Sequence, residues 1–423
     1  MGSLTVSKWR LGNGLEVILA PDPGATSISY MTWFKVGSRN ENEPAGETGL
    51  AHLFEHLMFT QTKGATVAGE LDQKLEEVGG NINAMTYYDF TAYIDNLPPG
   101  ELALAARLEA DRMVNLDLRD EQVANERDVV AEERLSAVED SVDGALDEIL
   151  WSQAFRAHPY RWPVIGWMKD IKAVTPAKAV AFYRTFYAPN NAVIVVAGKL
   201  DDQASALETI ARYYGPLPAS RTLPRDAARP DRAPATEVRA SIVRPVPADR
   251  MVIGYPAPAL GHRDRAAYDL LDEVLMGGPS SRLHRLLVIE KEIASSVSGD
   301  VAATRDPGLY ALWVQMKKGH RAPQAEAFMD AEIARLVREP VTASELGAAK
   351  NRLETELWRS LESSSGKAEQ LGQFEVSGGG FHRLLERAAE YATVTPADVQ
   401  RVARDYLGPG ARSIVVASAE KAP

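Results

Sequence analysis

Two histidines and a glutamate in the stretch His52-Leu53-Phe54-Glu55-His56 have the residue types and the spacing of a metal-dependent hydrolase. The pattern H-x-x-E-H is the metalloprotease motif H-E-x-x-H with the glutamate at the other end. In a helix, His52 and His56 project from one face, one turn apart, as two imidazoles must to bind one zinc ion. Glu55 lies on the same face, within reach of a zinc-bound water that could attack a peptide carbonyl.

The residues around this motif predict the helix that must position it. Thr48 is the expected N-cap, and the helix is expected to end near Phe59. At about 100° per residue, the apolar side chains fall on the face opposite the polar trio: Leu50, Leu53, Phe54, Leu57 and Met58. The alternative is two ordinary helical histidines beside a solvated glutamate, because a five-residue motif also occurs by chance.

A catalytic zinc ion usually takes a third protein ligand and keeps one position open. The acidic helix expected over residues 120–143 offers Glu126 and Glu133, which share one stripe because they lie seven residues apart. A solvated acidic face is the alternative for the other carboxylates of this helix. Spacing alone does not separate Glu132 from Glu133 as the ligand.

Composition excludes several classes of protein. The 423 residues are 45% apolar and 25% charged, as in an ordinary globular protein of two domains. A net charge of −11 argues against a nucleic-acid partner, and no apolar run is long enough to span a membrane. Cysteine is absent, so a metal site must use histidine and carboxylate.

Because Met1-Gly2-Ser3 does not read as a native start, we expect a signal peptide to have been removed and a periplasmic location, with the cytoplasm as the alternative.

An internal repeat with an offset of about 220 residues organises the chain. Val174-Thr175-Pro176-Ala177 returns as Val394-Thr395-Pro396-Ala397, and each copy is followed by a helix, a proline turn and a β-run. In the second copy of the metal motif, Leu270 and Val274 replace the two histidines. One half therefore carries the metal chemistry, and the other keeps only the helix.

The repeat and the composition together predict the domains. We expect an N-terminal zinc-bearing domain over residues 1–215, a Pro-rich linker over 216–236 and a homologous C-terminal domain without the metal motif over 237–423. Strands come in neighbouring pairs rather than alternating with helices. The predicted fold class is therefore α+β, with two homologous domains that each pack helices on a mainly antiparallel sheet.

The metal motif followed by the run from Glu126 to Glu133 resembles the pitrilysin/insulinase family, the inverted zincins. Further matches cover most of the chain: Leu11-Gly12-Asn13-Gly14-Leu15, Gly79-Gly80-Asn81-Ile82-Asn83-Ala84, His158-Pro159-Tyr160 and Ser280-Ser281-Arg282-Leu283. The resemblance implies two α+β halves that close like a clamshell around short or unstructured peptides.

The same resemblance assigns roles to individual residues. It implies that His52, His56 and Glu133 bind one zinc ion per chain, that Glu126 supports the site, and that Glu55 is the general base. Asn83 and Ala84 match an edge strand on which a peptide substrate is laid out by strand addition. An ordinary turn is the alternative for Asn83, and His158 is expected to be a structural landmark.

In one respect the chain departs from the family pattern. Members that act alone carry an Arg and a Tyr in the second half, seven residues apart, and here these positions are Val288 and Ser295. We therefore expect a zinc metalloendopeptidase subunit that works as a heterodimer with a homologous subunit carrying the Arg/Tyr pair. The alternatives are a non-catalytic scaffold and a peptide-binding member of the same fold.

Overall fold

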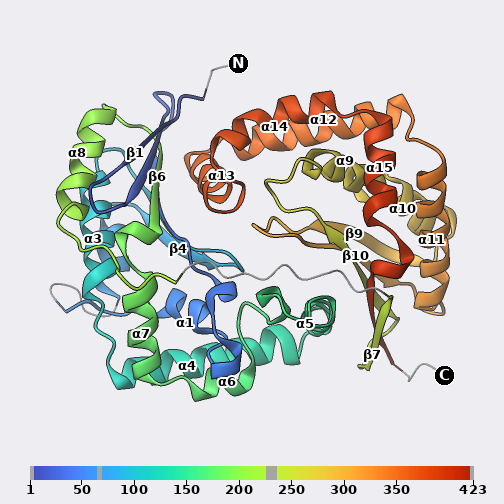
Figure 1. Cartoon of the computed structure of the whole chain (residues 1–423), viewed down its shortest axis with the longest axis horizontal. Helices are drawn as coiled ribbons and strands as arrows, with labels where there is room; N and C mark the ends of the chain where they lie inside the picture. The colour runs from blue at the N-terminus through green and yellow to red at the C-terminus, as the bar shows by residue number, and fades with distance from the viewer. Residues whose placement is uncertain (1–3, 64–68, 225–235, 420–423) are drawn as a thin grey trace. The chain divides into compact units, whose positions relative to one another are not determined.

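The computed structural model describes residues 4–63, 69–224 and 236–419, which form two compact units. Unit 1 comprises Met1–Arg134, Trp162–Ala228 and Ser360–Val376, and unit 2 comprises Leu135–Arg161, Arg229–Arg359 and Ser377–Pro423. Each unit is built on one sheet with helices packed against it (Figure 1). The predicted α+β class is confirmed. Within the described ranges, no helix is long and apolar enough to cross a membrane.

The sheet of unit 1 has the strand order β1-β2-β6-β3-β5-β4. Neighbouring strands are antiparallel except for β2 and β6, which run parallel. The strands are β1 (Ser7–Arg10), β2 (Glu16–Pro21), β3 (Ile28–Phe34), β4 (Asn81–Thr86), β5 (Thr91–Leu97) and β6 (Ala192–Gly198). Strand β4 ends the order, so one of its sides has no partner strand in this sheet.

The sheet of unit 2 repeats this topology without a counterpart of β1. Its order is β7-β11-β8-β10-β9, again with one parallel pair, β7 and β11. The strands are β7 (Val238–Val243), β8 (Arg250–Ala257), β9 (Ala294–Val301), β10 (Gly308–Met316) and β11 (Ser413–Ser418). The repeat in the sequence is thus a repeat of strand order, in which β9 takes the place of β4.

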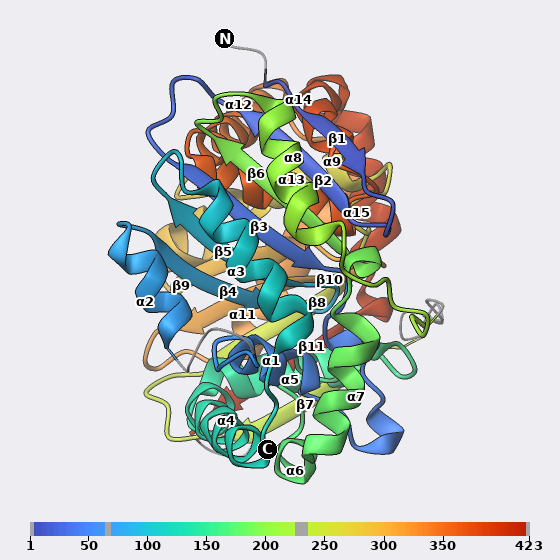
Figure 2. The same cartoon turned by 90° about the vertical axis from the view of Figure 1, so that its left-hand side faces the viewer.

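Helices cover the sheet of unit 1 on one face. Helices α3 (Leu102–Asn115) and α8 (Gln203–Tyr214) lie across that face (Figure 2). Their apolar side chains form one core with those of the short helix that carries the metal motif. The other helices that the first half of the chain contributes to this unit are α1 (Leu50–Leu57), α2 (Glu70–Glu77), α4 (Asp120–Arg134), α6 (Met168–Ala173) and α7 (Pro176–Phe186).

In unit 2, helix α9 (Arg265–Met276) is the counterpart of α1 in the repeat. Its Leu270 and Val274, which stand where α1 has histidines, are 0% and 3% exposed. This copy therefore uses the equivalent helix face for packing. The other helices that lie wholly or mainly in this unit are α5 (Val142–Ala154), α10 (Arg282–His284), α11 (Ala322–Arg338), α12 (Ala343–Ser360), α14 (His382–Thr393) and α15 (Pro396–Tyr406).

Each half of the chain contributes one helix to the unit built mainly by the other half. From the first half, α5 packs in unit 2, where Gln153 Nε2 donates to the carbonyl of Ile414 in β11 at 3.3 Å. From the second half, α13 (Ser364–Ser377) packs in unit 1, where Lys367 pairs with Asp22 at 2.7 Å. Strand β3 is buried at every residue because α13 covers the face that α3 and α8 leave open.

Several local predictions can be compared with this structure. Thr175 and Thr395 are N-caps as predicted, since the hydroxyl of each accepts a backbone N–H of the following helix. The continuous helix predicted over residues 120–143 is wrong. Helix α4 ends at Arg134, a π-helical turn spans Leu135–Glu139, and α5 begins after a new N-cap at Ser141. Of the predicted linker, residues 225–235 lie outside the described ranges.

The contact of α13 with unit 1 gives a stability prediction. A Cβ at Gly372 would lie 2.1 Å from Cε2 of Trp33, whereas a Cβ at Gly347 in α12 would meet nothing within 4 Å. Alanine is the better helix former at both positions. We expect Gly347→Ala to raise the free energy of unfolding by about 0.5–1 kcal/mol, and Gly372→Ala to lower it by about 1–3 kcal/mol. Urea unfolding measures both, and equal stabilisation by the two variants would contradict the packing of α13 on Trp33.

Candidate metal centre

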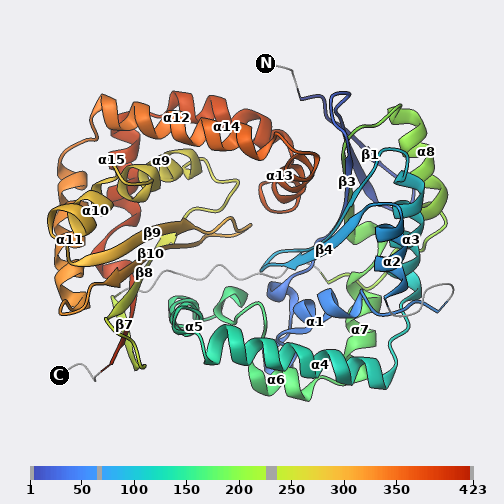
Figure 3. The same ribbon diagram turned by 180° about the vertical axis from the view of Figure 1, so that it is seen from behind.

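Helix α1 presents the metal motif on its polar face because its apolar face is buried. Its core residues are at most 2% exposed: Leu50, Leu53, Phe54 and Leu57. His52, Glu55 and His56 lie on the opposite side and are only partly buried. The helix packs beneath the free edge of the sheet, next to β4 (Figure 3). This arrangement places the two imidazoles and the glutamate near an exposed strand.

The start of α1 differs from the prediction. The N-cap is Gly49, not Thr48, and it adopts a left-handed conformation with φ of 88°. A Cβ there would lie 2.6 Å from the carbonyl oxygen of Ile165, so glycine is required. The Thr48 hydroxyl instead donates to Asp170 Oδ2 at 2.7 Å and accepts from the Trp167 backbone N–H. Thr48 therefore joins α1 to the segment around α6.

A buried glutamate takes over the capping of α1. Glu41 Oε2 accepts from the backbone N–H of Gly49 at 2.9 Å, and Oε1 accepts from that of Ala51 at 2.8 Å. Burial raises the pKa of Glu41, while these two donors act in the opposite direction because they bond the charged form. A carboxylate at a helix N-terminus is also favoured by the helix dipole. No local pattern in the sequence predicts this contact.

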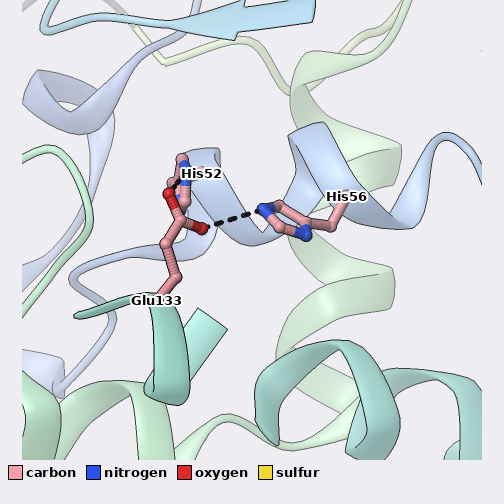
Figure 4. Close-up of side chains that lie close together, drawn as sticks. All are labelled: His52, His56 and Glu133. Carbon is pink, nitrogen blue, oxygen red and sulfur yellow. Dashed lines mark ion pairs between the residues drawn. The ribbon is translucent and has the colours of Figure 1, made fainter. Parts of the chain in front are cut away.

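Helix α4 supplies the third residue of the centre. The Glu133 carboxylate lies between the two imidazoles, 3.7 Å from His52 Nε2 and 3.3 Å from His56 Nε2 (Figure 4). One ligand atom from each of these residues lies within 4.8 Å of the others, and this is the one such group in the part of the chain that the structure describes. The neighbouring Glu132 is exposed and outside the group. Geometry thus distinguishes the two glutamates that spacing could not.

The donor set fits a zinc ion. Two ligands of a tetrahedral zinc, each about 2.0–2.1 Å from the metal, are roughly 3.4 Å apart. His56 Nε2 lies 3.3 Å from one Glu133 oxygen and His52 Nε2 lies 3.7 Å from the other, so small side-chain shifts would bring all three residues to this spacing. Glu126 lies 3.5 Å from His56 Nδ1 and can hold the tautomer whose Nε2 faces the metal position. The Glu133 side chain is 44% exposed. With these three protein ligands, a tetrahedral zinc ion would keep one position for a water or a substrate oxygen.

The carboxylates set the charges of the metal-free site. Contacts with Glu126 and Glu133 raise the pKa of His56 to about 9, and contact with His56 lowers the pKa of Glu133. Burial lowers the pKa of His52 to about 4, so this imidazole is neutral and ready to bind a metal at neutral pH. Zinc must displace a proton from His56, and affinity should therefore fall as the pH decreases below about 9.

Glu55 points toward the edge strand rather than into the histidine pair. Burial raises its pKa, while the neighbouring Thr86 of β4 and the charge of His56 lower it. A carboxylate with a raised pKa is better suited to accept and then release a proton near neutral pH. Glu55 thus lies beside the end of β4 and within electrostatic range of His56 and Glu133.

Asn83 and Ala84 lie in the middle of β4, so the alternative of a simple turn at Asn83 is wrong. The turn comes earlier, at Gly79, whose φ is 81°. Asn83 is exposed, and its Oδ1 accepts from the Ala84 N–H at 2.9 Å. His158 lies in unit 2, buried at 2% exposure, with Nε2 3.0 Å from Asp306 Oδ2. Its position agrees with the structural role expected for it.

Sequence and structure comparisons now place the chain among known proteins. A family model described as "Insulinase (Peptidase family M16)" matches residues 16–166, and one described as "Peptidase M16 inactive domain" matches residues 173–353. The chain belongs to this family. The resemblance inferred from the motifs is therefore confirmed.

Individual relatives cover nearly the whole chain. It is 30% identical to the zinc protease PqqE of Helicobacter pylori over 94% of this chain and 89% of the relative. It is 26% identical to the mitochondrial-processing peptidase subunit beta of Blastocladiella emersonii, over 94% and 85%. The crystal structure of a protease from Helicobacter pylori matches with a TM-score of 0.93 and 28% identity, covering 98% of this chain and 99% of that one. The first of these relatives is named as a zinc protease, the second as a subunit of a processing peptidase and the third as a protease.

Sequence reasoning missed two residues that hold α1 in place. One is Glu41 at its N-terminus. The other is Tyr93 in β5, whose hydroxyl donates to the carbonyl of Phe54 at 3.0 Å and lies 3.1 Å from the hydroxyl of Tyr187. The Tyr93 contacts join residues 39 and 94 positions apart, and Glu41 lies eight residues before Gly49, outside the usual N-cap positions. Neither periodicity nor motif spacing carries a signal for them.

The two neighbouring glutamates of α4 offer a matched test of the ligand set. We expect Glu133→Gln to lower zinc affinity by at least about 100-fold, because it removes a charged ligand, and Glu132→Gln to leave it unchanged. Competition with a chromogenic chelator measures both affinities, and circular dichroism checks that both variants fold. Equal affinities for the two variants would exclude Glu133 as a ligand.

Proposed function

We propose that this chain is the zinc-bearing subunit of a metalloendopeptidase that hydrolyses short or unstructured peptides. The observation that carries the proposal is the meeting of His52, His56 and Glu133 at distances that suit one zinc ion with a position left open. Membership of a peptidase family supports it, as do the relatives named as zinc proteases.

The residues of the site divide the work of peptide hydrolysis. A bound zinc ion would polarise the scissile carbonyl and make the attacking water more acidic. Glu55 takes a proton from that water as its oxygen bonds to the carbonyl carbon, and delivers the proton to the amine nitrogen when the C–N bond breaks. Glu126 keeps the His56 ring oriented. Burial raises the pKa of Glu55, which makes its carboxylate a stronger base for the first transfer.

Strand β4 is the proposed platform for the substrate. It is the last strand in the order of its sheet, so its outer N–H and C=O groups are available to an extended peptide. Asn83 and Ala84 lie at its centre, and Thr86 at its end is next to Glu55. Main-chain pairing recognises an extended backbone more than its side chains. This supports short or unstructured peptides as substrates.

Replacement of the proposed base tests the mechanism. We expect Glu55→Gln to retain one zinc ion per chain and to lower kcat for a quenched fluorescent peptide by at least about 100-fold, because the amide cannot take a proton. Glu132→Gln serves as the control and should keep wild-type activity. Normal cleavage by Glu55→Gln would refute the assignment. A wild-type chain that binds zinc and cleaves nothing, with or without a partner, would favour a scaffold or peptide-binding role.

The second half supports a requirement for a partner subunit. Val288, at the position of the expected Arg, packs against the core of unit 2. Ser295, at the position of the expected Tyr, is exposed at the start of β9, and its hydroxyl donates to the carbonyl of Gln315 at 3.1 Å. Neither side chain can supply a cationic or phenolic donor to a developing oxyanion. We propose that a homologous subunit supplies these donors in a heterodimer.

Activity with and without the partner tests this requirement. We expect a homologous subunit carrying the Arg/Tyr pair to raise kcat/KM by at least about 100-fold, the scale of a lost oxyanion donor. A partner with Tyr→Phe at its own position should recover only part of that gain. Robust cleavage by this chain alone, unchanged when the partner is added, would rule out the heterodimer.

A further inference from the structure

A short segment, Gly37–Glu41, connects the metal helix with the turn that follows β4. At one end, both carboxylate oxygens of Glu41 accept backbone N–H groups of the first turn of α1, at 2.9 Å from Gly49 and 2.8 Å from Ala51. Glu41 is 8% exposed. A buried carboxyl group that accepts two backbone N–H groups at these distances holds them in a defined geometry. They fix the backbone immediately before His52.

The other end of the segment is bonded to the β4–β5 turn. The backbone N–H of Ser38 donates to the carbonyl of Tyr87 at 3.2 Å, and that of Arg39 to the carbonyl of Tyr88 at 3.0 Å. The Arg39 guanidinium pairs with Asp89 at 2.8 Å, and both side chains are 3% exposed. A buried ion pair with two backbone bonds makes this end rigid.

One end of the segment contacts the metal helix α1, and the other contacts the turn after β4, the proposed substrate strand. Thr86, the last residue of β4, is beside Glu55, and the turn bonded to Ser38 begins at the next residue. Glu41 accepts the backbone N–H of Ala51, and His52 is the next residue in the chain. The same five residues therefore set the first turn of the metal helix against the strand proposed to carry the substrate.

We propose that Glu41 is a positioning residue of the metal centre, which holds His52 in register with Glu133 and Glu55 in register with β4. This proposal rests on the proposed zinc peptidase function. It predicts that a change at Glu41 alters zinc affinity, which can be measured without any assay of activity. An ordinary N-cap contributes to folding stability only. A positioning residue must also change how well the preformed site binds its metal.

A second buried carboxylate provides a matched control. Asp249 caps α11 in unit 2, where its Oδ2 accepts the backbone N–H of Ala322 at 3.0 Å and the Nε–H of Arg321 at 3.0 Å. Asp249 is 5% exposed, close to the value for Glu41. Its helix carries none of the residues of the metal centre. Asp249→Asn therefore removes a comparable cap without touching α1.

The experiment compares zinc affinity in Glu41→Gln and Asp249→Asn by competition with a chromogenic chelator. We expect Glu41→Gln to lose about tenfold in zinc affinity, while Asp249→Asn keeps the wild-type affinity although both metal-free proteins melt at lower temperature. For a quenched peptide, Glu41→Gln should lower kcat with little change in KM. Glu41→Asp keeps the carboxyl group but is one methylene shorter, and it should lose less zinc affinity. It replaces Glu41→Gln in the comparison if that variant does not fold.

Two outcomes overturn the positioning role. One is wild-type zinc affinity in both Glu41 variants, and the other is an equal loss of affinity in Asp249→Asn. The proposed peptidase function fails separately, if the wild-type chain binds zinc and cleaves no peptide in the presence of its partner. In that case the comparison of zinc affinities still decides the role of Glu41.

Discussion

The burial of one face of the short helix α1 is the constraint on which the rest of the structure depends. This helix has eight residues, too few to be stable without tertiary contacts. Phe54 and Leu57 are fully buried, and Phe54 stacks on Phe182 and Tyr183 of α7. Since this face is anchored in the core, the opposite face is turned toward α4 and β4, and it carries both histidines and Glu55. The direction of the metal ligands is thus a consequence of packing.

Anchoring from three sides makes the helix rigid. Glu41 holds its N-terminal turn, Tyr93 donates to the carbonyl of Phe54 near its C-terminal turn, and α4 lies along its polar face. These contacts hold the helix in place, with Glu133 of α4 between the two imidazoles. A helix held in this way also keeps Glu55 beside Thr86 of β4.

The two units share one topology, but the helix beside the sheet edge has a different role in each. In unit 1, the polar face of the helix beside the sheet edge carries the candidate metal ligands His52 and His56. In unit 2, the equivalent positions are Leu270 and Val274, which join the core. The exchange of α5 and α13 gives each sheet a cover for its second face from the other half. Neither half, as a continuous stretch of chain, contains all the helices that bury its own sheet.

Much of this could be predicted from the sequence because it depends on local periodicity. Helical spacing placed His52, Glu55 and His56 on one face, and the repeat predicted paired α+β units that the two sheets confirm. Pro after Thr175 and Thr395 marked two helix starts correctly. The resemblance indicated Glu133, but the choice between Glu132 and Glu133 was open on spacing alone, because it depends on how α4 is rotated against α1.

Tertiary structure alone decided the remaining features. Thr48 was a reasonable N-cap by residue type, yet a bond to Asp170, distant in sequence, removed it from that role. The helix predicted through Asp143 is interrupted after Arg134, where the chain passes from unit 1 into unit 2. The contacts of Tyr93 and α13 likewise join segments that no sequence window contains, and the Glu41 contact spans only eight to ten residues but follows no capping pattern. Local sequence fixes what each element is and which face it offers, whereas long-range contacts determine which faces meet.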